Sequence, residues 1–322
     1  MKTLKFIFIF LFTIQFIFSQ EYTTTVEILN EKNNPVKEKI EQNLSKILNT
    51  LTESSFSNIK QIKLDNNISS QDGINSINEL WSNRKFRTAE TELLVYLSKR
   101  HKETKYEVRD IPLIQLDDNG TVVYQNGVFT FTSSGKLEDV KFGLPEKDYK
   151  QILKTGIGAL EESRRLVILD FIENFRTAYD RKDLKYIESV FSNDAIIIVG
   201  KVITKEKRGI KLEGNVEDQK VELVKFSKKE YIDKLGVTFK RNSFIKLKFD
   251  TIEVTQSRMN QHFYAVNLIQ EWRSSSYEDK GYLFVLIDFT IEEKPLIHVR
   301  AWEPYKQTIK NQRIVIGDFD VN

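Results

Sequence analysis

The chain contains no cysteine among its 322 residues. This absence excludes a disulfide framework, a thiolate metal site and a cysteine nucleophile. Histidine is also scarce, with only His101, His262 and His298. None of the three lies within helical reach of another, so a zinc site would need distant ligands, and we expect no bound metal.

Common catalytic signatures are missing as well. The sequence contains no G-x-S-x-G, H-E-x-x-H or G-x-x-x-x-G-K-[ST] motif. Gly156-Ile157-Gly158 begins like a dinucleotide fingerprint, but Glu161 occupies the position of the third glycine and no strand immediately precedes it. We therefore expect no cofactor, and no motif names a reaction.

Neither sign of charge dominates. The chain has 49 Lys and Arg residues against 46 Asp and Glu residues. Basic stretches such as Lys205-Glu206-Lys207-Arg208 are short and contain acids. Binding to nucleic acid or to an anionic membrane needs a clustered positive field, so neither is an expected partner.

The N-terminus has the order of a secretory signal peptide. Lys2 and Lys5 precede an apolar run from Phe6 to Phe18, and Ser19 is a small residue at the expected cleavage point. The run is shorter than the roughly 20 residues that span a bilayer as a helix. We interpret residues 1–19 as a signal peptide and expect a periplasmic or cell-surface protein, with an uncleaved membrane anchor as the alternative.

Residues 20–145 read as an N-terminal α+β domain. Pro35 opens a helical pattern in which Val36, Ile40, Leu44, Ile47 and Leu51 share one face. A short strand is expected at 22–28 and a second helix at 74–81. Strand-like runs separated by turn residues then predict an antiparallel meander over 86–97, 106–116, 121–132 and 137–144.

Residues 146–163 read as a linker and 164–304 as a second domain. The pattern predicts helices at 164–180 and 184–191, a buried strand at 195–199, and a helix at 228–241 with a capping box of Ser227 and Glu230. Long strands are expected at 244–255, 262–273, 281–291 and 295–304. Residues 305–322 form a C-terminal extension, with a possible edge strand at 314–319.

The element order of this second half carries a family resemblance. The segments 171–179 (FIENFRTAY), 183–184 and 191–195 (FSNDA) form its entry, and 281–284 and 297–302 (IHVRAW) form its last strands. These segments resemble the nuclear transport factor 2-like superfamily, a cone-shaped fold shared with ketosteroid isomerase. The resemblance implies an α+β fold with a curved antiparallel sheet wrapped around helices, and says little about activity.

The whole chain also resembles exported two-domain bacterial proteins for which we know no reaction, through the segment Tyr106–Pro112 (YEVRDIP). One alternative is that the first half is a diverged copy of the second, because 131–137 is similar to a late hairpin of the superfamily. Within Tyr106–Pro112, Arg109 and Asp110 interrupt a strand. We favour a structural hydrogen-bonding role for them over a ligand groove.

A ligand pocket is expected inside the curved sheet of the second half. Alternate residues of a strand share a face, which groups His298 with Arg300 and Trp302, and Tyr282 with Asp288. We expected Asp288 opposite Arg300, with Trp272 joining from the preceding strand. Asp288 and Tyr282 would supply a base and a hydrogen-bond donor. The alternative is that this face is the outer one, solvated or buried in a dimer.

Three functions remain open from the sequence. The preferred one is a non-enzymatic exported module that binds a small hydrophobic ligand or an envelope protein. The second is an isomerase or hydrolase that uses the pocket, which requires an acid with a raised pKa in its lining. The third is a scaffolding component with a large uncovered apolar sheet face. A homodimer through the open sheet face is compatible with all three.

Overall fold

We analysed a computed structural model of the chain, which describes residues 23–99, 104–116, 122–144, 147, 162–204 and 219–305. The expected signal peptide at 1–19, most of the expected linker and the expected strand at 314–319 lie outside the described residues. Buried apolar side chains form one large cluster within residues 26–142 and another within residues 144–302. The two clusters follow the two halves that the sequence indicates.

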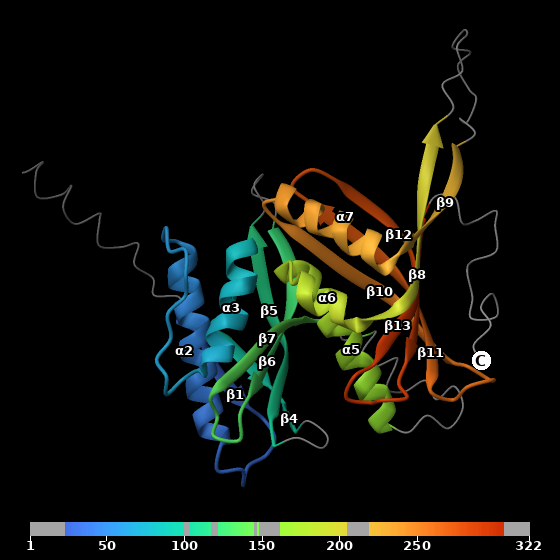
Figure 1. Cartoon of the computed structure of the whole chain (residues 1–322). Helices are drawn as coiled ribbons and strands as arrows, with labels where there is room; N and C mark the ends of the chain where they lie inside the picture. Colours follow the sequence, from blue (N-terminus) through green and yellow to red (C-terminus); the bar gives the residue numbers. More distant parts are fainter. Residues whose placement is uncertain are drawn as a thin grey trace, which may run out of the picture.

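The N-terminal half packs two helices against an antiparallel sheet (Figure 1). Helix α2 (Lys37–Ser55) buries Ile40, Leu44, Ile47 and Leu51, which is the predicted stripe. Helix α3 (Gln71–Asn83) begins at Ser70, whose side chain accepts a hydrogen bond from the Gly73 amide. The meander of β5 (Tyr106–Leu116), β6 (Val122–Phe131) and β7 (Leu137–Gly143) confirms the predicted strand order.

The single strand predicted over 86–97 was wrong. This segment forms β2 (Phe86–Arg87), β3 (Glu92–Val95) and β4 (Leu97–Lys99). Strands β2 and β4 pair with β5, whereas β3 pairs in parallel with β1 (Thr25–Ile28). The segment breaks because its parts find partners in different sheets, which a local pattern does not encode.

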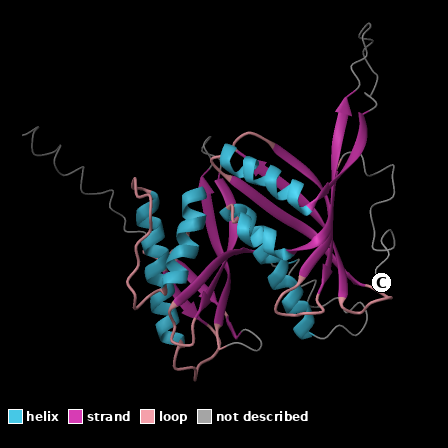
Figure 2. Cartoon of the chain, viewed as in Figure 1, coloured by secondary structure: helices cyan, strands magenta, loops and turns pink. Residues whose placement is uncertain are grey.

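In the C-terminal half, three helices line a curved six-stranded sheet (Figures 1 and 2). The helices are α5 (Glu162–Arg181), α6 (Leu184–Val190) and α7 (Lys228–Arg241). The sheet order is β10-β11-β12-β13-β8-β9. Its strands are β8 (Phe191–Thr204), β9 (Gln219–Ser227), β10 (Ile245–Gln256), β11 (Phe263–Ser274), β12 (Glu278–Asp288) and β13 (Leu296–Pro304).

Helix α5 places its apolar stripe against the concave face of this sheet. The predicted stripe is buried, and Phe175 makes edge-to-face ring contacts with Tyr179 and Phe191. The capping box of Ser227 and Glu230 starts α7 as predicted. The α+β class and the arrangement of helices inside a curved, mostly antiparallel sheet are therefore confirmed.

Two features of this sheet differ from the prediction. The strand expected at 195–199 extends over 191–204, because β8 pairs along its length with β9 and also in parallel with β13. Strand β9 was not predicted at all. The idea of an internal duplication is wrong, because the N-terminal sheet has the order β2-β5-β6-β7 and no parallel pair among these strands.

The opposite side of α5 carries charged side chains that join the two halves. Arg176 is 2% exposed. Its Nε donates to the Leu247 carbonyl on β10 at 2.8 Å, and its Nη1 and Nη2 donate to the Gly143 carbonyl and Gln125 Oε1 at 2.7 and 2.6 Å. One guanidinium therefore binds the backbone of both sheets.

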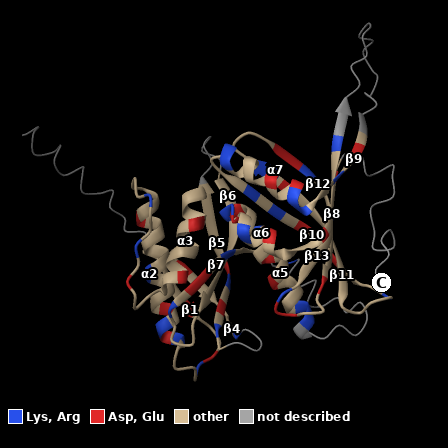
Figure 3. Ribbon diagram, viewed as in Figure 1, with Lys and Arg blue, Asp and Glu red and all other residues tan. Residues whose placement is uncertain are grey.

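Glu173 lies one turn before Arg176 on α5 and forms an ion pair with Arg109 of β5. A bulge in β5, where Asp110 has a φ of 60°, directs this strand toward α5. Arg109 donates to both Glu107 and Glu173, which confirms the structural role expected for it. Burial opposes ionisation of Glu173, but Arg109 and Lys141 hold its pKa below the ordinary value. Figure 3 shows residues of both signs on each half, including β5, β7 and α5.

Asp180, at the end of α5, gives this interface a pH dependence. Its Oδ1 accepts a hydrogen bond from the Leu247 amide at 2.7 Å. Burial raises its pKa to about 6, although Arg176 opposes the shift. Because the folded pKa exceeds the ordinary value of 3.8, the folded chain binds more protons than the unfolded chain between these values. Asp180 therefore lowers stability as the pH rises from about 4 to 6.

The Asp180→Asn variant is expected to lose this dependence while keeping an oxygen for the Leu247 amide. Urea unfolding of variant and parent at pH 4, 5, 6 and 7 should show the variant gaining relative stability up to pH 6, and no further gain above it. Asp233→Asn, at an exposed site on α7, is the control and should show no such trend. A difference in stability between Asp180→Asn and the parent that stays constant from pH 4 to 6 would contradict a raised pKa of Asp180 in the folded chain.

Candidate functional site

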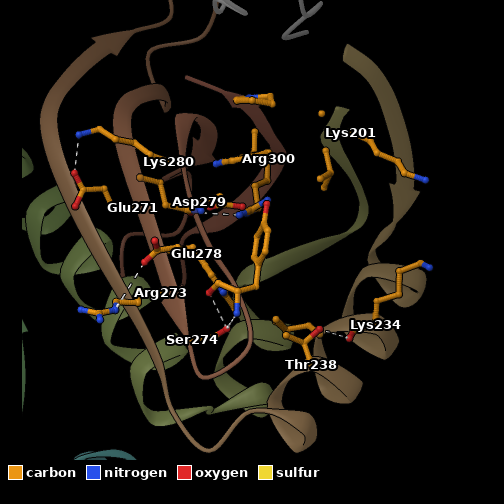
Figure 4. Close-up of a pocket in the computed structure, with 18 of the residues that line it drawn as sticks. Lys201, Lys234, Thr238, Glu271, Arg273, Ser274, Glu278, Asp279, Lys280 and Arg300 are labelled. Carbon is orange, nitrogen blue, oxygen red and sulfur yellow. Dashed lines mark hydrogen bonds and ion pairs between the residues drawn. The ribbon is translucent and has the colours of Figure 1, made fainter. Parts of the chain in front are cut away.

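A cleft with a volume of about 1250 Å³ opens on the concave side of the C-terminal sheet. Residues of β8, β9, α7, β11, β12 and β13 line it. We call it the concave cleft. Figure 4 shows the side chains around it, with Arg300 and Asp279 on neighbouring strands and Thr238 on the helix α7.

Arg300 and Trp302 on β13 form the floor of the concave cleft. They are two residues apart in one strand and therefore share a face. Arg300 lies opposite Val285 and Trp302 lies opposite Leu283, both of which are core residues of the concave side. Arg300 is 5% and Trp302 is 6% exposed.

Aromatic rings make up much of the remaining wall, namely Phe226, Tyr231, Trp272, Tyr277 and Tyr305. The Tyr231 hydroxyl lies 2.7 Å from that of Tyr179, which is buried on α5 beneath the cleft. Burial raises the pKa of Tyr179 well above its ordinary value, so its phenol stays a neutral hydrogen-bonding group at physiological pH. Such a wall suits a flat apolar ligand.

The guanidinium of Arg300 donates a hydrogen bond to the Tyr179 hydroxyl and has two weaker neighbours. It lies 5.3 Å from the centre of the Tyr231 ring, and its Nη2 reaches Gln270 Oε1 at the long distance of 3.4 Å. Burial works against its charge, but Tyr231, Tyr179 and Asp279 together raise the pKa of Arg300, so it remains a cation. Its Nε and the Trp302 Nε1 are buried without a hydrogen-bond partner among the described residues.

Asp279 on β12 is the acid of the cleft that interacts electrostatically with Arg300. It lies opposite Trp272 in the β11–β12 ladder, and its Oδ1 is buried without a hydrogen-bond partner among the described residues. Burial raises the pKa of Asp279, while Tyr277 and Arg300 oppose the shift. The cleft thus contains an acid with a raised pKa, which the hypothesis of an isomerase or hydrolase requires.

The rim charges are mostly paired with one another. Lys280 lies 2.7 Å from Glu271, and Arg273 lies 3.9 Å from Glu278. The remaining cations of the lining are Lys201 and Lys234 at the edge and Arg300 at the floor, against Asp279 as the remaining acid. Basic side chains therefore outnumber acidic ones in the lining of the concave cleft.

The structure brings together three of the six predicted site residues. Trp272, Arg300 and Trp302 line the concave cleft. The predicted ion pair of Asp288 with Arg300 was wrong, because Asp288 lies opposite Leu296 instead. The connection between β12 and β13 sets a register in which Arg300 lies opposite Val285, three residues before Asp288. A bulge at His298 then shifts the pairing by one further residue and separates His298 from the face of Arg300.

The other three predicted residues lie on the opposite, convex face. His298 Nε2 lies 3.7 Å from Asp288 Oδ2, and the His298 ring lies against Phe263. Tyr282 stacks on Tyr305 with ring centres 5.1 Å apart. The apolar side chains of this face, Ala265, Phe284, Leu286, Val299 and Ala301, are buried within the chain.

Sequence reasoning missed Asp279, Tyr231 and Gln270 as cleft residues. The predicted strand begins at residue 281, whereas β12 begins at Glu278 and includes Asp279. Within the described residues, no three His, Asp or Glu side chains gather in a way that could hold a metal ion. None of the described helices combines the length and the apolar character needed to cross a membrane.

No protein-family model matches this chain, and no curated protein matches it. Among solved structures, it is similar to Bd1075 of Bdellovibrio bacteriovorus at 13% identity, over 53% of this chain and 46% of that one, with a TM-score of 0.34. It is also similar to the helical cell-shape determining protein Pgp2 of Campylobacter jejuni at 12% identity, over 44% of this chain and 41% of that one, with a TM-score of 0.33. The chain therefore spans less than half the length of both proteins.

A third similar structure is a nuclear transport factor 2-like protein from Cytophaga hutchinsonii. The identity is 12% over 44% of this chain and 98% of that one, with a TM-score of 0.29. Residues 162–304 hold helices in the concave face of a curved sheet, which is the arrangement that the sequence resemblance implies.

Proposed function

We propose that the protein is an exported, non-enzymatic module that binds a small, largely apolar molecule in the concave cleft. The observation that carries the proposal is the cleft itself, about 1250 Å³ in volume, with aromatic walls and a few polar groups at its floor. Binding sites for small molecules typically combine an apolar lining with a small number of placed polar groups.

The proposed export rests on the sequence of residues 1–19, with its basic start, apolar run and small residue. The absence of cysteine is compatible with a bacterial envelope, where the hydrophobic core alone can hold an exported fold. A periplasmic or cell-surface location, and either a small ligand or an envelope protein as partner, form part of the same proposal.

Occupying part of the concave cleft with a large side chain is expected to weaken binding of an apolar probe. Thr238 lines the cleft from α7, and its hydroxyl donates only to the Lys234 carbonyl of the same helix. Thr238→Trp should weaken binding of the neutral fluorescent probe N-phenyl-1-naphthylamine at least about tenfold, since the ring occupies the space of the probe. Probe fluorescence, titrated with protein, measures the change.

The neighbouring variant Val237→Trp is the matched control. Val237 is 47% exposed on the same helix and does not line the cleft. It should leave probe affinity unchanged. Absence of probe binding to the parent, or equal affinities for both variants, contradicts the proposed function.

Asp279 favours a second candidate function, an isomerase or hydrolase that uses this cleft. Its raised pKa suits a group that exchanges a proton. In the Tyr179–Tyr231 pair one hydroxyl donates to the other, which leaves one O–H as a donor for a developing oxyanion. Turnover that disappears in Asp279→Asn while probe binding remains would distinguish catalysis from binding alone. For a scaffolding role we find less support, because the apolar residues of the convex face are buried.

A further inference from the structure

The floor of the concave cleft contains two buried donors that nothing described in the chain satisfies. They are Arg300 Nε and Trp302 Nε1, on one face of β13. Buried polar groups are hydrogen-bonded in the large majority of native structures, and a buried tryptophan N–H usually finds a partner. Two such donors side by side indicate a place for an acceptor from outside the chain.

The charge of the site narrows the chemistry of this acceptor. Arg300 remains a cation, while burial disfavours the ionised form of Asp279, the acid that faces it. The rim acids Glu271 and Glu278 are already paired with Lys280 and Arg273. A neutral carbonyl could accept from these donors, whereas an oxyanion would also add to the compensation that Asp279 gives the buried guanidinium.

We propose that the ligand of the concave cleft is a flat apolar molecule with one carboxylate-type oxyanion, which lies against Arg300 and Trp302 Nε1. This inference rests on the proposed binding function and specifies its ligand class. The planar fork of arginine matches the two oxygens of a carboxylate, and the rings of Tyr231 and Trp272 enclose the apolar body.

A matched pair of probes tests the proposal. Naphthalene-2-carboxylate and naphthalene-2-carboxamide share a ring system and differ in the charge of one substituent. Hydrogen bonds to charged groups contribute about 1.5–3 kcal/mol, so the carboxylate should bind the parent protein about ten- to hundredfold more tightly at pH 7. Displacement of N-phenyl-1-naphthylamine measures both affinities.

Three variants test whether Arg300 and Trp302 cause the preference for the carboxylate probe over the carboxamide probe. Arg300→Gln should reduce the preference to near unity and change the carboxamide affinity little, whereas Arg300→Lys keeps the charge and should retain part of it. Trp302→Phe removes the Nε1 donor together with part of the apolar indole surface. Both probes lose that surface equally, so the ratio of their affinities should fall a few-fold through the lost donor. A thermal unfolding curve shows whether Arg300→Gln folds. If it does not, the affinity ratio measured for Trp302→Phe tests the proposal.

Lys240→Gln is the control for a simple change of net charge. Lys240 is exposed on α7 and does not line the cleft, so the preference should be unchanged. Equal affinity of the parent for both naphthalene probes overturns the proposal, and so does a preference that survives in both Arg300→Gln and Trp302→Phe. If the parent binds N-phenyl-1-naphthylamine in either case, the proposed binding function stands and only the ligand class falls.

Discussion

Arg176→Met is expected to lower the free energy of unfolding by about 3–5 kcal/mol, because it removes one member of a buried charged group and leaves the other behind. The guanidinium of Arg176 compensates the nearby Asp180 and donates to backbone on β10 and β7. Methionine fills a similar volume but donates nothing. The Leu247 and Gly143 carbonyls would then lose the hydrogen bonds that Arg176 supplies.

Urea unfolding at pH 7 measures the change, followed by tryptophan fluorescence. Trp81 reports on the N-terminal half, while Trp272 and Trp302 report on the C-terminal half. Arg241→Met, at an exposed position at the end of α7, is the control and should change stability by less than about 0.5 kcal/mol. A loss below about 1 kcal/mol for Arg176→Met would mean that packing alone holds the two halves together.

The double variant Arg176→Met with Asp180→Asn separates the charge from the hydrogen bonds. Removing both charges eliminates the uncompensated carboxylate, so part of the lost stability should return relative to Arg176→Met alone. The remainder would reflect the carbonyl groups of both sheets. No recovery would show that Arg176 acts through its backbone contacts and not through Asp180.

Much of this fold follows from local patterns in the sequence. The apolar stripe of α5 lies within a single helix, and the capping box of α7 lies within a single helical turn. Both signals are local in the sequence, so they predicted these helices correctly. Strand β9 was missed because it is stabilised by pairing with β8, and this pairing leaves no local pattern in the sequence of β9. The broken segment 86–99 failed for the same reason, since its three strands pair with two different sheets.

The candidate site was harder to predict than the fold. The rule that alternate residues share a face holds from Arg300 to Trp302, and it placed both correctly on one face. It fails at His298, where a bulge moves this residue to the convex face. The bulge interrupts the pairing of β13 with both β12 and β8, and the sequence of β13 alone does not indicate it.

The polar face of α5 was also invisible to the sequence analysis. Glu173 and Asp180 look like solvent-facing residues in an amphipathic helix, since they lie outside the apolar stripe. The N-terminal sheet covers that face, which buries both acids against Arg109 and Arg176. Contacts between residues so far apart in the sequence leave no periodic pattern.

Gly281→Ala is expected to lower stability by about 3 kcal/mol and to weaken ligand binding as well. Gly281 on β12 is buried directly beneath the indole of Trp302. A Cβ at this position would lie 2.6 Å from Trp302 Cε2, and closer still to the carbonyl oxygen of Glu303. Neither the backbone of β13 nor a packed indole can move freely, so the substitution must displace the floor of the concave cleft.

The matched control is Gly236→Ala on α7. There, a new Cβ meets only Leu184 Cδ2 at 3.2 Å, and alanine is favoured over glycine inside a helix by about 1 kcal/mol. This control should therefore keep or slightly raise the midpoint of urea unfolding. Gly281→Ala should lower the midpoint and reduce the affinity for N-phenyl-1-naphthylamine together, because one displaced indole causes both effects. Unchanged probe affinity in a destabilised Gly281→Ala protein would show that Trp302 does not shape the binding site.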